Sequence, residues 1–98
     1  MTTTKSPTTF KVNINHTVAV ADSSAANSTA FASETREVRI VCTVDAYVDF
    51  GTSPTASSSN LIIPAYTPEY FRVAPSTKVA FLRVGSVTGT ARVTEVTQ

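Results

Sequence analysis

The chain has 98 residues, which is enough for one domain with a single core. Only 15% of the residues are charged and the formal net charge is +1, so nothing indicates the clustered basic surface that nucleic-acid binding requires. No apolar run approaches the roughly 18 residues of a membrane-spanning helix, and the polar N-terminal residues do not resemble a signal peptide. We therefore expect neither nucleic acid nor a membrane among its partners.

Hydroxyl groups supply most of the polarity, because the chain holds 17 threonines and 11 serines. Threonine is β-branched and fits the pleated surface of a sheet, whereas the strong helix formers Leu, Glu, Lys and Gln are scarce. No segment repeats apolar residues with the period of a helix. The composition predicts an all-β protein.

The first residues differ from the rest of the chain. Residues 1–9 are rich in Thr and contain Lys5 and Pro7, but they offer almost nothing that a core would bury. We expect a flexible N-terminal arm over 1–9 and a single domain over 10–98.

Short runs with a period of two predict the strands of that domain. In order they cover 10–14, 17–21, a weak run at 30–32, two runs within 36–50 separated near Asp45, then 61–63, 69–73, 78–84 and 91–96. Val38, Ile40 and Cys42 share the apolar side of the first run within 36–50. Residues 22–28 and 51–60 are expected to be loops, and the strand ending at Val84 is expected to form a hairpin with the one that begins at Ala91.

Seven to nine short strands at this spacing, without helices, are typical of a small antiparallel β-sandwich of the jelly-roll type. For the strand at 78–84 we expect cover on both faces. Pro64 and Pro68 cannot donate to a strand ladder, so the segment between them should lie at an edge or outside the sheets.

The sequence gives little indication of a catalytic site or a metal site. His16 is the one histidine, too few for a metal centre within one chain, and no nucleophile motif accompanies it. We interpret it as a polar residue at a strand end. Asp45 and Asp49 are interpreted as solvated rim residues, and the other carboxylates are isolated in sequence. Cys42 should be a small buried side chain in a protein made in a reducing cytoplasm. We expect no enzyme activity and no cofactor.

The tyrosines admit two interpretations. Tyr47, Tyr66 and Tyr70, together with Arg72, have the composition of a face that binds sugar or protein, since aromatic residues and Arg are enriched in interface cores. Alternatively, the tyrosines cover a small sheet while their hydroxyls remain in water.

Several short motifs from Val38 to Thr97 resemble small structural proteins of tailed bacteriophages. The matching residues are Phe50-Gly51-Thr-Ser-Pro54-Thr55-Ala56, Ile63-Pro64-Ala65, Pro68-Glu69-Tyr70-Phe71-Arg72-Val73-Ala74-Pro75 and Arg92-Val93-Thr94-Glu95. The resemblance covers about 60% of the chain. It implies a virion component of the capsid decoration or cement type, assembled in the host cytoplasm and located on the capsid surface.

The expected partners are therefore the major capsid protein and further copies of this chain. The residues expected to make these contacts are Thr2, Thr3, Thr4, Lys5, Pro7, Tyr66, Tyr70 and Arg72. Two alternatives stay open, a neck or tail subunit of the phage and a carbohydrate-binding β-sandwich module.

Overall fold

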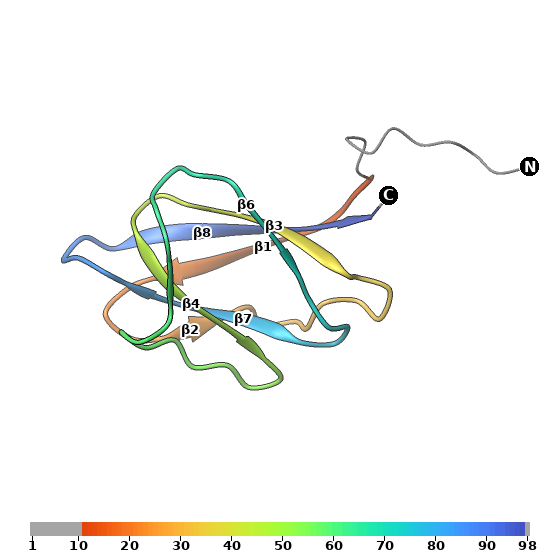
Figure 1. Cartoon of the computed structure of the whole chain (residues 1–98), viewed down its shortest axis with the longest axis horizontal. Helices are drawn as coiled ribbons and strands as arrows, with labels where there is room; N and C mark the ends of the chain where they lie inside the picture. Colours follow the sequence, from red (N-terminus) through yellow and green to blue (C-terminus); the bar gives the residue numbers. More distant parts are fainter. Residues whose placement is uncertain (1–10, 98) are drawn as a thin grey trace, which may run out of the picture.

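The computed structural model describes residues 11–97, which form two four-stranded antiparallel sheets packed face to face (Figure 1). Sheet A contains β1 (Lys11–Val20), β8 (Gly89–Thr97), β3 (Glu37–Cys42) and β6 (Glu69–Arg72). Sheet B contains β2 (Ala25–Ala26), β7 (Lys78–Arg83), β4 (Ala46–Gly51) and β5 (Leu61–Ile63). The described part includes no helix with the length and hydrophobicity needed to cross a membrane. The predicted all-β sandwich is confirmed.

The strand order is that of an eight-stranded jelly roll. The sheets run β1-β8-β3-β6 and β2-β7-β4-β5, and every connection crosses between them except the one from β4 to β5. Because neighbouring strands are antiparallel, four connections meet at one end of the sandwich: β1–β2, β3–β4, β5–β6 and β7–β8 (Figure 1). We call this the four-loop end. Lys11 and Thr97 lie opposite each other at the other end.

Backbone hydrogen bonds join the connections at the four-loop end. The Tyr66 amide donates to the Cys42 carbonyl at 2.7 Å, and the Val84 amide donates to the Asp45 carbonyl at 3.1 Å. The segment from Pro64 to Pro68 lies outside both sheets, as its prolines predict.

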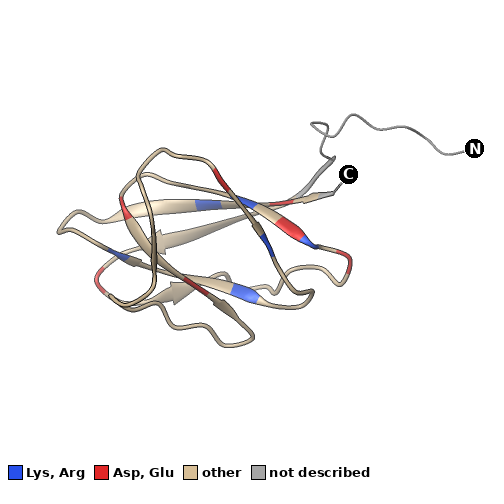
Figure 2. Cartoon of the chain, viewed as in Figure 1, with Lys and Arg blue, Asp and Glu red and all other residues tan. Residues whose placement is uncertain are grey.

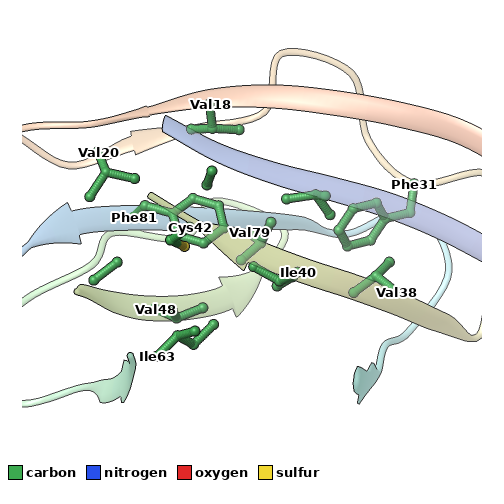
Figure 3. Packing of buried hydrophobic residues seen from close by; sticks show 13 residues of the cluster. Val18, Val20, Phe31, Val38, Ile40, Cys42, Val48, Ile63, Val79 and Phe81 are labelled. Atoms are coloured by element: carbon green, nitrogen blue, oxygen red, sulfur yellow. The ribbon is translucent and has the colours of Figure 1, made fainter. Parts of the chain in front are cut away.

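The core fills the space between the sheets with the period expected for strands. Val38, Ile40 and Cys42 of β3 are completely buried, which confirms their predicted orientation. Phe81 of β7 lies in the middle of the same cluster, and Phe31 points into it from a loop (Figure 3). Residues 30–32 form no strand, contrary to expectation. Phe31 is held instead by backbone bonds to Ser76 and Thr77.

The N-terminal half of the domain differs from the prediction in two places. The runs at 10–14 and 17–21 belong to one continuous strand, β1, because Asn15 and His16 continue the ladder with β8. The predicted loop at 22–28 contains the short strand β2, which pairs with β7.

The predicted hairpin between Val84 and Ala91 is wrong. The two strands lie in different sheets, where β7 pairs with β2 and β4 while β8 pairs with β1 and β3. The β3–β4 turn bridges the gap, since Thr43 exchanges two bonds with Thr90, one through its amide and one through its hydroxyl oxygen, both 2.9 Å long.

Strand β7 is covered on both faces at its centre, as expected: Val79, Ala80 and Phe81 are all fully buried. The outer face of sheet B is covered here by the turn-rich loop at 51–60. In that loop the Ala56 amide donates to Ser24 Oγ at 2.9 Å and the Thr55 amide to Asp49 Oδ2 at 3.1 Å.

Candidate functional site

The residues expected to contact partners lie in three parts of the chain. Thr2, Thr3, Thr4, Lys5 and Pro7 are outside the described residues. Tyr66 lies at the four-loop end with 71% of its surface exposed and a left-handed backbone, φ 57°.

Tyr70 and Arg72 are two positions apart on β6, the edge strand of sheet A, and both are exposed on its outer face. The structure therefore brings Tyr70 and Arg72 together and places Tyr66 in a separate connection. Tyr47 lies on sheet B, in register with Leu82 of β7 and Ile62 of β5. The tyrosines do not form one continuous aromatic face.

Strand pairing places three arginines from distant parts of the sequence on the outer face of sheet A. Arg72 of β6 is opposite Glu37 of β3, Arg39 is two positions further along β3, and Arg92 of β8 is opposite Val41, two positions beyond Arg39. The three side chains thus follow a diagonal across neighbouring strands, and diagonal neighbours in a sheet are roughly 7–8 Å apart. Figure 2 shows these positions as blue segments close together on β6, β3 and β8. We call this set the arginine stripe.

The arginine stripe differs from the other arginines in its bonding. Arg36 donates to the carbonyls of Ser33 and Thr35, and Arg83 donates to the Thr88 hydroxyl. Within residues 11–97 the guanidinium groups of Arg39, Arg72 and Arg92 make no hydrogen bond or ion pair. The stripe therefore leaves three guanidinium groups available for bonds to a partner.

Tyr70 lies beside the stripe, directly opposite Arg39 in the β3–β6 ladder. Arg39 and Arg92 were missed as candidates because the basic residues are scattered along the sequence. The alternation within each strand gives the face on which each arginine lies, but only the pairing of β3 with both β6 and β8 brings the three together.

The interpretation of His16 as a strand-end residue is wrong. It lies within β1, is only 9% exposed, and its Nε2 donates to Oε2 of the fully buried Glu95 at 2.6 Å. Its ring also meets Phe31 edge-on, with centroids 5.8 Å apart. The period of two that buries Val18 and Val20 puts His16 on the same inward side of the strand.

Three hydrogen-bond donors bind the Glu95 carboxylate. Its Oε1 accepts from the Thr35 hydroxyl at 2.5 Å and from the Ala32 amide at 3.0 Å, in addition to the bond from His16. Burial alone would raise the pKa of Glu95, but the hydrogen bonds from Thr35, His16 and Ala32, with the charge of His16, outweigh it and hold the pKa below its usual value. The carboxylate thus joins β1 and the β2–β3 connection to β8.

A pocket of about 320 Å³ opens between β1 and residues 27–30, next to His16 and Glu95. Both oxygens of Glu95 are already engaged by protein donors, which identifies the carboxylate as a structural anchor in this arrangement. Asn27, also in the wall, accepts from the Val79 amide at 2.9 Å and donates to the Thr29 carbonyl at 2.6 Å. Among the described residues no group of three His, Cys, Asp or Glu side chains is placed to hold a metal ion.

Cys42 is fully buried, as expected, and burial raises the pKa of its thiol to about 11. The reactive thiolate is therefore suppressed at neutral pH.

Comparison with protein-family models, with curated proteins and with solved structures finds no match to this chain.

Proposed function

We propose that this chain is a non-enzymatic structural protein of a tailed-phage virion, which decorates and stabilises the capsid. It acts as a homo-oligomer on the capsid surface, in contact with the major capsid protein. The resemblance of the motifs between Val38 and Thr97 to small phage structural proteins supports this proposal. The compact jelly roll is compatible with it, since viral capsid domains are among the proteins that use this architecture.

The observation that carries the proposal is the number of large apolar side chains exposed at and beside the four-loop end. Tyr66 is 71% exposed and Val87 65%, while Leu61 and Ile62 of the short edge strand β5 are 57% and 46% exposed. Single exposed apolar residues are ordinary, but several of them on two neighbouring connections and an adjoining edge strand are typical of a surface that meets another protein. Copies of this chain packed side by side would cover such residues.

Carbohydrate binding is the second candidate, and the placement of Tyr70 and Arg72 on one exposed face favours it. A glycan array separates the two functions, since a decoration protein should show no saturable binding of sugars.

The test of the main proposal is quantitative mass spectrometry of purified particles of the phage whose genome encodes this chain. A copy number close to that of the major capsid protein would support decoration. A few copies per particle would favour the neck or tail subunit, and complete absence would exclude the virion proposal.

A further inference from the structure

The outer face of sheet A has a local excess of positive charge, and among residues 11–97 no side chain pairs with these arginines. The arginine stripe of Arg39, Arg72 and Arg92 is accompanied by one carboxylate, Glu37, which does not lie within ion-pairing distance of them. Neighbouring positions of the stripe are roughly 7–8 Å apart, which is within the Debye length of about 8 Å at physiological salt, so neighbouring arginine charges repel each other modestly. A surface that presents complementary negative charge removes this repulsion and gains charge-assisted hydrogen bonds.

The remaining residues of this face favour a protein surface as the complement. Tyr70 stands opposite Arg39, and Val41 stands opposite Arg92. Tyr and Arg are among the side chains enriched where proteins meet, and a half-buried valine adds apolar contact. Nucleic acid is disfavoured by the single Glu37 beside the stripe and by a formal net charge of only +1.

The size of the face limits the area that a single contact can bury. Four strands at about 4.8 Å spacing and six residues at about 3.3 Å each give a flat area of about 400 Å². This is about half of the roughly 800 Å² that each partner contributes to a stable protein complex. One copy would therefore bind weakly, and several linked copies would be needed for firm attachment.

We propose that the arginine stripe, with Tyr70, docks this chain on an acidic protein surface. The identification of that surface with the capsid subunit rests on the proposed function, but the chemistry of the stripe does not.

The first test needs no phage particle. The ¹⁵N-labelled protein is titrated with a poly-glutamate peptide at low ionic strength, and the amide shifts are mapped. We expect shifts on β3, β6 and β8, reversed by added salt. A double variant, Arg39→Gln with Arg92→Gln, should weaken binding about tenfold through the loss of two charge-assisted contacts. Lys78→Gln is the matched control, because Lys78 lies on β7 in the other sheet and should change the affinity less than about twofold.

Equal losses in the double variant and in a double control, Lys78→Gln with Arg83→Gln, both on β7 of sheet B, would overturn the stripe as the docking surface. So would shifts that map to sheet B. Tighter binding of a duplex DNA oligonucleotide to the same residues would overturn the choice of a protein partner. Thermal unfolding of each variant verifies that it remains folded.

The second test adds the same variants to particles that lack this chain. Weak binding of the Arg39→Gln, Arg92→Gln protein with normal binding of Lys78→Gln identifies the capsid contact. Equal binding of both variants would show that the stripe does not make that contact, although the chain belongs to the virion. Absence of the chain from native particles would instead remove the proposed function and leave the poly-glutamate result standing.

Discussion

Glu95 illustrates how one buried charge organises several segments. Its three protein donors come from His16, Ala32 and Thr35, so the loss of any one removes a hydrogen bond from a buried carboxylate. His16 and Glu95 are 79 positions apart, so no local sequence pattern indicates that they pair. Alternation with Val18 and Val20 would have predicted an inward His16, but only the β1–β8 register identifies its partner.

We predict that Thr35→Val destabilises the protein. The side chain is almost completely buried, and valine keeps its shape while removing the hydroxyl that donates to Glu95. The free energy of unfolding should fall by about 1–3 kcal/mol, measured by chemical denaturation. Thr94→Val is the matched control, because the Thr94 hydroxyl bonds only to exposed Asn15 and its loss should cost less than about 0.5 kcal/mol. Equal effects would contradict the anchoring role of Glu95.

Glu95 should also make stability depend on pH in the acid range. Its folded-state pKa lies below the ordinary value of 4.5, so the unfolded chain takes up the proton first as the pH falls. The stabilisation is complete above that ordinary value and is lost as the pH falls through the lowered folded-state pKa. Unfolding free energies of the native protein and of Glu95→Gln, compared from neutral to acid pH, should converge in acid. A constant difference would contradict the prediction.

At the scale of single elements, alternation predicted orientation well and pairing poorly. The inward side of β3 and the outward Tyr70 and Arg72 of β6 follow directly from a period of two. The incorrect β7–β8 hairpin had the same local pattern as a true one, because a short polar loop serves equally to turn within a sheet and to cross between sheets. The distinction lies in contacts with the β3–β4 turn, which no local pattern contains.

Gly89, the first residue of β8, packs closely against the β3–β4 turn where the β7–β8 connection ends. A Cβ added there would lie 2.5 Å from Thr43 Oγ1 and 2.7 Å from Val44 Cγ2. Thr43 Oγ1 also accepts from the Thr90 amide, so it cannot rotate away without breaking that bond. Gly89→Ala should therefore cost about 1–3 kcal/mol of unfolding free energy. Gly51→Ala is the control, since nothing lies within 4 Å of the position its Cβ would take, and it should be close to neutral. Similar losses in both variants would refute the steric explanation.

For the whole molecule, composition and spacing were sufficient to predict an all-β sandwich, because burial with a period of two leaves few alternatives for a chain of this length. The surface was less predictable. Tyr66, Tyr70 and Arg72 were chosen from local composition, whereas the arginine stripe depends on strand order, which places positions 39, 72 and 92 on adjacent strands.

Deletion of residues 2–9 tests whether the predicted N-terminal arm contributes to binding. The domain should remain folded, because the described strands begin at Lys11, and its unfolding midpoint should stay unchanged. Binding to capsid particles should weaken, as measured by co-sedimentation. A variant in which 2–9 are replaced by a Gly/Ser sequence of equal length separates the loss of specific contacts from the loss of length. Unchanged binding of both variants would refute a role for the arm.

The pairing of Lys11 with Thr97 also makes this fold suitable for circular permutation. Residues directly opposite on antiparallel strands are about 5 Å apart, so a few glycines could join these two positions. New ends could be opened in the exposed loop from Val84 to Thr88, at the opposite end of the sandwich. Both sheets would keep every strand, and a fused peptide would then project from the four-loop end.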